Sequence, residues 1–234
     1  MAGTAPPHLS DYRQIQAPAG TSRLVASRFP PIQTFEAVST PEDLAAVMEL
    51  EGWTNDRLVR ARLERLDRSE WVFGRPNASL VMAAFLHPAL RGQRFSGRDL
   101  GAWYASSEVK TALVEVATGM RRELVLSGIP SLTQTWRQYK ADLRGSYIDI
   151  FGLHPEFHDP DPSTYGRSQA FGESVRRLGP RFGVAGIRYE SVRRRGHENW
   201  VCYRPPLVTN VVQAAHFEIR LRAEGPVHVR ELTV

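Results

Sequence analysis

"RFSGRDLGAWYASSEVKTALVEV", residues 94–116, places strand, turn and helix signals almost edge to edge. Two β-like runs, 92–96 and 101–105, flank "GRDLG", whose glycines allow the turn of a hairpin. A helix is predicted over 106–120, and its apolar residues repeat at helical spacing to form a buried stripe: Val109, Ala112, Leu113, Val116 and Met120. Glu115 lies at one flank of the stripe, where it faces either solvent or a cleft beside the sheet.

Upstream of this stretch, helical signals dominate. Thr40 is the expected N-cap of a helix over 40–52, and a second helix is predicted over 54–67 with its charged residues in solvent. The apolar centre of "FGRPNASLVMAAFLHP" (73–88) indicates a buried strand or short element.

Downstream, the strand signals take over. The segment 132–143 fits either a strand or a helix, and 163–179 predicts a helix with Ala170, Phe171, Val175 and Leu178 inward. Alternation then predicts strands over 186–192 and 199–205, joined by the turn "RRRGHE", and more strands over 216–232. Helices early, strands late and no βαβ rhythm predict an α+β fold.

The 234-residue chain fits one sizeable domain with an ordinary apolar core, since 42% of its residues are hydrophobic. We expect this domain to span 23–234, after a poorly ordered tail over 1–22 that is rich in Ala, Pro, Gly and Ser.

The charge of the chain is skewed toward arginine. Thirty basic residues face 25 acidic ones, and only Lys110 and Lys140 are lysines, which leaves 28 arginines. Arginine binds phosphate and carboxylate groups in a bidentate manner, so the skew fits an anionic ligand. An arginine-rich proteome would give the same skew without any ligand.

Several classes of protein are disfavoured by what the sequence lacks. One cysteine, Cys202, excludes an internal disulfide and disfavours a thiolate metal site. No apolar run is long enough to span a bilayer, and the first residues do not resemble a signal peptide, so we expect a cytoplasmic protein. The glycine patterns of Rossmann and P-loop nucleotide sites are absent from the sequence.

Three further motifs have plainer explanations. "HPEFHDPDP" (154–162) contains His and Asp residues but has the composition of an exposed loop, so no metal site is expected. Cys202 and His197 resemble a thiol nucleophile and its base, but Cys202 lies in a strand where a small buried residue is expected. The arginines of "SVRRRGHE" (191–198) suit nucleic-acid phosphates, although a solvated hairpin tip explains them better.

Four blocks of the chain together resemble the RES domain, a family named for an arginine, a glutamate and a serine. They are "SRFPPIQTFE", the stretch 94–116, "YGRSQAFGESVRRLG" and "GIRYESVRRRGHENWVCYRP", and the resemblance covers about residues 24–206. The family is best known as the toxin half of two-gene toxin and antitoxin systems. The resemblance implies a fold similar to ADP-ribosyltransferases, with a central mixed or antiparallel sheet and flanking helices.

The resemblance also implies which residues form the site. The family's two arginines fall on Arg28 and Arg94, its tyrosine on Tyr104 and its glutamate on Glu115, eleven positions later. This chain has "QRFSG" where relatives commonly have "GRWNP", so the backbone near Arg94 is expected to differ.

The family's serine has two candidates in this sequence. Ser168 precedes the "QAFG" pattern, and Ser191 opens the "SVR" block; with them Gln169 and Arg193 become candidates for binding NAD or phosphate. No metal is implied.

The implied activity is NAD degradation by cleavage of the nicotinamide to ribose bond. We expect an NAD phosphorylase that uses inorganic phosphate as co-substrate and has no prosthetic group, with NAD hydrolysis or protein ADP-ribosylation as the nearest alternatives. An antitoxin partner is implied as well, usually a helical Xre-like protein. A non-catalytic basic module that binds nucleic acid is the alternative from another class.

Overall fold

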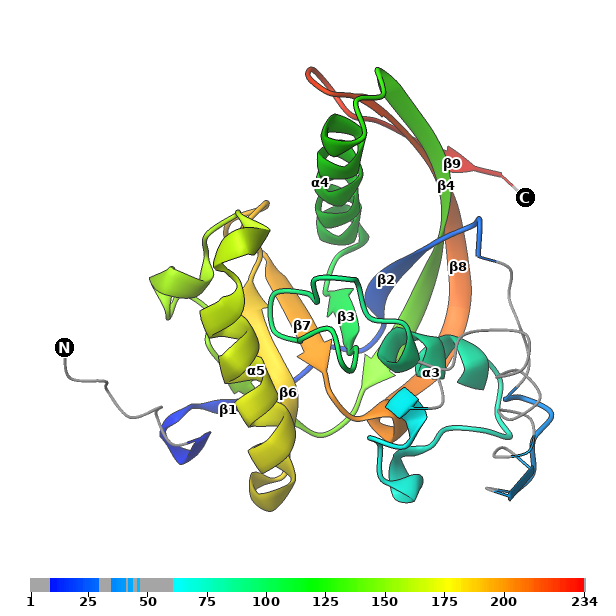
Figure 1. Ribbon diagram of the computed structural model, residues 1–234, viewed down its shortest axis with the longest axis vertical. Helices are drawn as coiled ribbons and strands as arrows, with labels where there is room; N and C mark the ends of the chain where they lie inside the picture. The colour runs from blue at the N-terminus through cyan, green and yellow to red at the C-terminus, as the bar shows by residue number, and fades with distance from the viewer. Residues whose placement is uncertain (1–8, 30–34, 41, 44–45, 47–60, 234) are drawn as a thin grey trace.

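The computed structural model describes residues 9–29, 35–40, 42–43, 46 and 61–233. Within them, one sheet with helices packed against it confirms the α+β class (Figure 1). Of the helix predicted over 40–52, the structure describes residues 40, 42, 43 and 46, and Asp43 N donates to Thr40 Oγ1 at 3.1 Å, which confirms Thr40 as the N-cap. Residues 54–60 of the helix predicted over 54–67 lie outside the described residues.

The longer helices are α3 (Ala78–Leu86), α4 (Val109–Leu126) and α5 (Gly166–Leu178). Single 3-10 turns are η1 (Leu9–Asp11), η2 (Arg68–Glu70), η3 (Pro155–Phe157), η4 (Pro162–Thr164), η5 (Gly179–Phe182) and η6 (Pro205–Leu207). The strands are β1 (Gln14–Gln16), β2 (Thr21–Ala26), β3 (Trp103–Ser106), β4 (Ser131–Leu143), β5 (Ser146–Asp149), β6 (Val184–Glu190), β7 (Glu198–Cys202), β8 (Val208–Arg222) and β9 (His228–Leu232).

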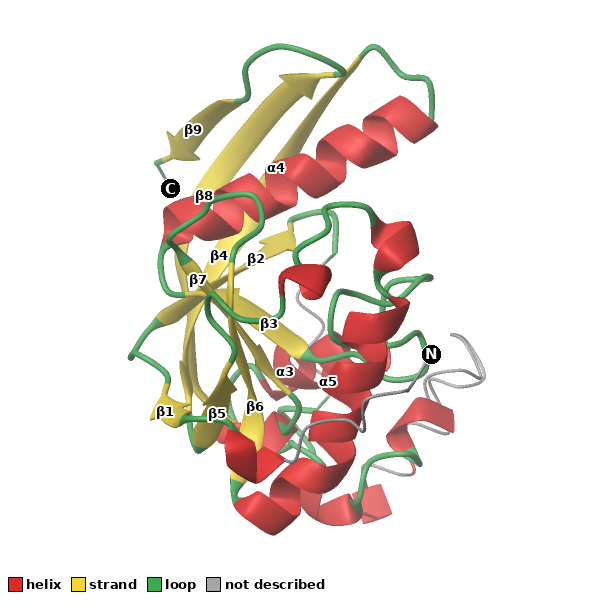
Figure 2. Ribbon diagram, turned by 90° about the vertical axis from the view of Figure 1, so that its left-hand side faces the viewer, coloured by secondary structure: helices red, strands yellow, loops and turns green. Residues whose placement is uncertain are grey.

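The described strands form one sheet in the order β1-β5-β6-β7-β3-β2-β4-β8-β9. Every neighbouring pair is antiparallel except β5 with β6. The short strand β3 therefore lies between β7 and β2, at the middle of the sheet. Figures 1 and 2 show β4 and β8 extending beyond β2 and β3, with β9 at the outer edge of this extension and α4 along one face of it.

Each helix buries one apolar surface against the sheet. α3 and Trp103 belong to the largest core cluster, whereas α5 packs with Phe95 and the inner residues of β6 and β7. The predicted stripe of α4 packs on β2, β4 and β8, where Ile219 and Leu221 are buried as the alternation predicts. The helical period of 106–120 and the strand period of 216–222 were thus sufficient to orient these elements.

Three local predictions differ from the structure or are settled by it. The hairpin predicted over 92–105 is wrong: residues 93 and 96 close a bridge with each other, and β3 pairs with β2 and β7 instead. The run at Ala78–Leu86, predicted as a buried strand or short element, is a helix, because a short segment that is buried nearly all round has no readable period. The ambiguous segment 132–143 is strand β4.

The tail expected over 1–22 is wrong for the part that the structure describes. Residues 14–16 form β1, which pairs with β5, and the following residues open β2 with Thr21 and Ser22 buried. Backbone hydrogen bonding to a partner strand decides order here, and composition does not report it. Among the described residues, no helix has the length and apolarity required to cross a membrane.

Candidate active site

Glu115 projects from α4 toward the loop and strand that follow β6. Only Ser107 and Glu108 separate β3 from α4, so the helix starts at the middle of the sheet. Glu115 Oε1 accepts a hydrogen bond from Ser191 Oγ at 2.7 Å and another from Asn199 Nδ2 at 2.9 Å. Among the described residues, none hydrogen-bonds to Oε2. One oxygen of the carboxylate is therefore fixed while the other is left for a ligand.

The two donors to Glu115 are themselves buried and held. Ser191 is 0% exposed; its backbone N–H donates to His197 O, and its hydroxyl oxygen accepts from Arg194 N at 3.0 Å. Asn199 is 3% exposed, and its Oδ1 accepts from Ser106 Oγ at 2.5 Å. A buried donor held in this way orients a carboxylate without needing to reorganise.

Ser168 and Gln169, on α5, have a different task. Ser168 is 2% exposed and its hydroxyl hydrogen-bonds to the carbonyl oxygens of Arg94 and Tyr165, at 2.6 and 3.0 Å. Gln169 Nε2 donates to the carbonyl oxygens of Arg91 and Gln93, both at 3.0 Å. Both side chains therefore brace residues 91–101, which we call the Arg94 loop.

Tyr104 fastens the same loop from β3. Its hydroxyl accepts from Phe95 N at 3.1 Å and lies 3.0 Å from Ser96 Oγ. Burial raises the pKa of Tyr104 to about 12, against which its hydrogen bonds with Ser96 and Phe95 act in the opposite direction. The phenol is accordingly neutral at physiological pH, and its hydrogen bonds attach the Arg94 loop to β3.

Arg94 is held by neutral groups alone in the described part of the chain. Its guanidinium donates to the carbonyl oxygens of Phe157 and Asp159 and to Tyr165 Oη, and it lies 4.5 Å from the centroid of the Tyr165 ring. No ion pair of Arg94 with a carboxylate is found there. Its position is fixed but its positive charge is not neutralised, which suits an anionic ligand.

Arg23 lies within β2, whereas Arg28 follows the end of that strand. Arg28 is exposed beyond the end of the strand, with its guanidinium 5.1 Å from the centroid of the Phe29 ring. No contact among the described residues joins Arg28 to Glu115, Arg94 or Tyr104. Arg94 and Tyr104 also make no hydrogen bond or ion pair with Glu115 among the described residues, so this absence does not test Arg28, whose role stays a prediction.

Arg23, within β2, contacts the strand that carries Tyr104, but its side chain lies on the Trp103 face of the sheet, opposite the side chain of Tyr104. Its Nη1 donates to Tyr104 O at 3.1 Å and its guanidinium lies 4.9 Å from the centroid of the Trp103 ring. Burial lowers the pKa of Arg23 to about 10, so the group stays cationic at neutral pH. Its Nε is buried and has no hydrogen-bond partner in the described structure.

Tyr104, Glu115 and Arg94 all act electrostatically on one further side chain, that of Tyr189. Burial raises its pKa well above the ordinary value, the neighbouring Tyr104 and Glu115 raise it further, and Arg94 lowers it. Tyr189 also packs on Phe95 of the Arg94 loop, with 4.8 Å between ring centroids. The carboxylate of α4, the tyrosine of β3 and the arginine of the loop thus lie within electrostatic range of one buried phenol.

Comparison with protein-family models gives one match, the RES domain, over residues 62–222 of the 234. The chain belongs to the RES domain family. This membership confirms the resemblance in the central and later blocks, and it places the chain among toxin-like enzymes that act on NAD. The matched region begins after Arg23 and Arg28, so it does not assign the first arginine. No curated protein matches the chain.

In this RES domain the two candidate serines have different hydrogen-bond partners. Ser191 donates to Glu115, whereas Ser168 binds backbone carbonyl groups of the Arg94 loop. Asn199 was missed because strand alternation presents it only as one polar residue at the start of β7. Its burial and its bond to Ser106 depend on neighbouring strands that are distant in sequence.

The remaining motifs of this RES domain are occupied by internal contacts. Arg193 donates to Pro160 O at 2.7 Å, and Arg194 binds Glu108 Oε2 and Thr111 Oγ1 at 2.5 and 2.8 Å, so two of the three turn arginines are engaged. Cys202 is fully buried, and burial raises the pKa of its thiol, as expected for a packed residue. In the described ranges no three His, Cys, Asp or Glu side chains gather in a way that would hold a metal ion.

Proposed function

We propose that this RES domain cleaves NAD between nicotinamide and ribose, with Glu115 as the group that stabilises the transition state. The observation that supports this most directly is the carboxylate of Glu115, fixed through Oε1 by Ser191 and Asn199 and unpartnered at Oε2 among the described residues. A negative charge that is already oriented stabilises a developing positive charge without a reorganisation cost.

The cleavage needs such a charge at one place. As the bond from the ribose anomeric carbon to the pyridinium nitrogen breaks, its electron pair leaves with nicotinamide, which becomes neutral. The sugar then acquires oxocarbenium character, as it does in glycoside cleavage, and an anionic oxygen close to the ring lowers the barrier. Glu115 supplies that oxygen.

The two linking phosphates of NAD require cations that are not already neutralised. Arg94 meets this condition, because the described residues give it no carboxylate partner. We assign Arg94 to the phosphates, and the exposed Arg28 stays the second candidate for the same ligand. Tyr104 acts mainly through the Arg94 loop, whose shape its hydroxyl maintains.

Inorganic phosphate is the acceptor we favour. A phosphate oxygen would attack the anomeric carbon as nicotinamide departs, which gives ADP-ribose 1''-phosphate. With water as acceptor the oxygen loses a proton and the product is ADP-ribose; with a protein side chain the product is a modified protein. All three share the same first bond cleavage and the same need for Glu115.

The test is to incubate the purified chain with NAD, with and without inorganic phosphate, and to identify the products by mass spectrometry. Release of nicotinamide with a sugar phosphate that appears only when phosphate is present supports the proposal. ADP-ribose at an unchanged rate under both conditions replaces phosphorolysis by hydrolysis. If NAD survives intact over hours at micromolar enzyme, the catalytic proposal fails.

A further inference from the structure

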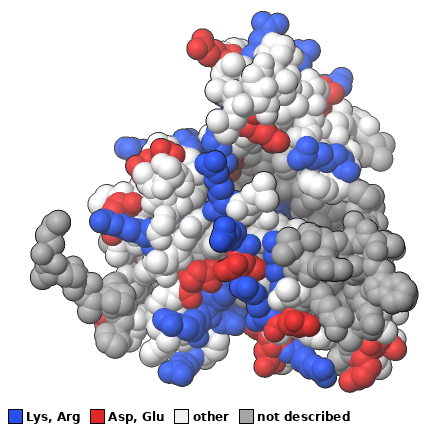
Figure 3. Space-filling view, in the orientation of Figure 1, with Lys and Arg blue, Asp and Glu red and all other residues white. Residues whose placement is uncertain are grey.

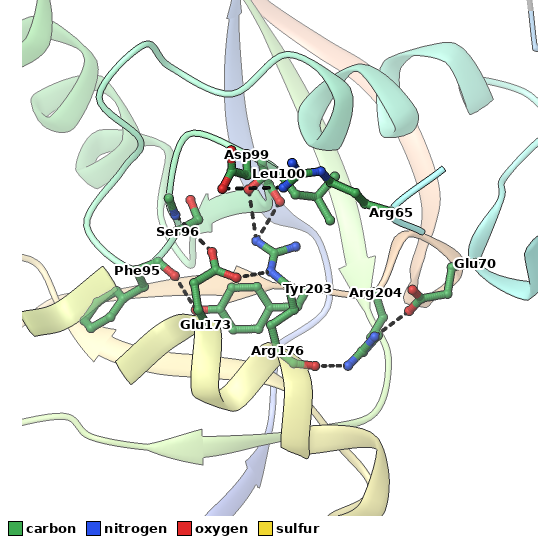
Figure 4. Close-up of polar contacts among 12 residues, drawn as sticks. Arg65, Glu70, Phe95, Ser96, Asp99, Leu100, Glu173, Arg176, Tyr203 and Arg204 are labelled. Carbon is green, nitrogen blue, oxygen red and sulfur yellow. Dashed lines mark hydrogen bonds and ion pairs between the residues drawn. The ribbon is translucent and has the colours of Figure 1, made fainter. Parts of the chain in front are cut away.

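A pocket of about 250 Å³ lies at the C-terminal end of α5, away from Glu115. Its wall combines the end of α5, the turn η2 with the residues before it, the Arg94 loop and the segment after β7. The residues that line it are Arg65, Leu66, Glu70, Leu100, Arg176, Arg177, Pro180, Tyr203 and Arg204. Figure 4 shows Arg65, Arg176 and Arg204 reaching this region from three separate parts of the chain.

Two of these arginines are fixed in the wall. Arg176 lies 4.7 Å from the centroid of the Tyr203 ring, and its Nη2 donates to Leu100 O and Gly101 O at 3.2 and 2.8 Å. Its Nη1 is buried and has no hydrogen-bond partner in the described structure. Arg204 pairs with Glu70 at 2.7 Å and donates to the carbonyl oxygen of Arg176.

The other two arginines stand at the rim. Arg65 lies 3.4 Å from Asp99, but the two side chains are 54% and 70% exposed, so the pair contributes little. Arg177 is exposed and has no partner among the described residues. Either guanidinium is therefore free to turn to a new anion.

The balance of charge in the pocket is positive. Four arginines line it with one carboxylate, Glu70. Glu173 and Asp99, which pair with Arg176 and Arg65 from outside the lining, still leave one guanidinium in excess. Figure 3 shows Lys and Arg side chains gathered beside Asp and Glu side chains toward this end of α5. A ligand with two or more negative charges fits this arrangement better than a neutral one.

We propose that this pocket binds the phosphate group of a small phosphorylated molecule. Arg176 and Arg204 supply a preorganised wall, and Arg65 and Arg177 close on the phosphate from the rim, with the ligand replacing Asp99 as the partner of Arg65. Guanidinium forks match phosphate oxygens in pairs, which gives both strength and orientation.

The pocket shares the Arg94 loop with the proposed NAD site, through Leu100, but lies at the other end of α5. Arg94 contacts Tyr165 and Ser168 at the start of α5, whereas the pocket begins at Arg176. Eleven residues of helix separate Tyr165 from Arg176, about 16 Å at the rise of an α-helix. None of the lining residues belongs to the hydrogen-bond chain around Glu115.

The test is isothermal titration of inorganic pyrophosphate, and separately of adenosine monophosphate, into three forms of the full chain at low salt. These are the wild type, the double variant Arg65→Ala/Arg177→Ala, and the control Arg220→Ala/Arg222→Ala. The control removes the same charge from exposed positions on β8, far along the sheet. Arg65 and Arg177 are exposed, so thermal melting should show that all three forms fold alike.

We expect at least one of the two ligands to bind the wild type, and the pocket variant to lose about tenfold or more in affinity while the control changes little. The tighter of the two ligands then identifies an inorganic or a nucleotide phosphate. Equal losses in both variants would show that only net charge matters and would overturn the site. The site would also be overturned if affinity falls in a fourth form, Arg94→Ala, but not in the pocket variant. No binding of either ligand at millimolar concentration also overturns it. Because the readout is binding and not NAD cleavage, this result stands apart from the proposed activity.

Discussion

At the scale of single residues, the carboxylate of Glu115 is distinguished by what holds it. Two buried donors reach the same oxygen, and they come from positions 76 and 84 residues farther along the chain. An ordinary exposed glutamate on a helix would have neither. The flank of the α4 stripe, which periodicity left open between solvent and a cleft, is thus turned toward other polar groups of the protein.

Glu115→Gln keeps the shape of the side chain and removes its charge. We expect NAD turnover to fall by at least about a hundredfold, because a preorganised charge contributes about 3 kcal/mol or more to the transition state. Nicotinamide release, followed by chromatography, measures the change. Glu123→Gln, at an exposed position on the same helix, is the matched control and should keep its rate. Near-normal turnover in Glu115→Gln would remove this residue from the mechanism.

The two serines provide a paired test. Ser191→Ala removes a hydrogen bond to a charged group, worth about 1.5 to 3 kcal/mol, so turnover should fall about tenfold or more. Ser168→Ala leaves buried carbonyl groups of the Arg94 loop without their donor, so it should lower the free energy of unfolding by about 1 to 3 kcal/mol.

Turnover at saturating NAD and urea unfolding of each variant separate the two roles. In the expected pattern, Ser191→Ala shows the larger loss of rate and Ser168→Ala the larger loss of stability. The opposite pattern would make Ser168 the serine that serves the chemistry.

The raised pKa of Tyr104 gives a prediction at alkaline pH. Because the folded-state pKa, about 12, lies above the ordinary value of 10.0, the stability that this phenol contributes is complete below pH 10 and is lost as the pH rises toward 12. An ultraviolet titration of the wild type minus that of Tyr104→Phe should therefore show an ionisation step near pH 12. A difference step near pH 10 would mean that the phenol is neither buried nor held by the loop.

At the scale of elements, α5 organises the Arg94 loop. Ser168 and Gln169 hold its backbone carbonyl groups, and Glu173 accepts from Gly97 N at 2.9 Å. The absence of a side chain at Gly172 allows this close approach, since a Cβ there would lie 1.9 Å from Phe95 O. The helix is thus a scaffold for the loop that carries the site arginine.

The elements that could be predicted are those whose pattern is local in the sequence. α4, α5 and the β6 and β7 pair were predicted because helical and strand periods are local properties of the sequence. The hairpin at 92–105 was wrong because glycines and β-like residues also suit a loop, and here side chains of α5 bind its backbone.

The part of the site that escaped prediction is fixed by non-local pairing. Asn199 owes its position to β7 lying next to β3, far from α4 in sequence. No local pattern distinguishes this residue from a solvent-facing one.

At the scale of the whole molecule, the sheet has β9 at one edge. β9 pairs only with β8, its residues are mostly exposed, and it lies beyond the matched region that ends at residue 222. We expect a chain that ends after Arg222 to fold and to keep NAD turnover within about twofold, because no site residue contacts this edge strand in the described structure. Circular dichroism and nicotinamide release check the two statements, and loss of activity in a folded truncation would show that β9 supports the site.

The long separation between α4 and the donors to its carboxylate also affects how the protein is made. While the ribosome has synthesised β3 and α4 but not yet the strands β6 and β7, Glu115 lacks both Ser191 and Asn199. A nascent or prematurely terminated chain of this kind contains the carboxylate without its anchors. Under the proposed function, NAD cleavage would begin only after most of the chain has emerged from the ribosome.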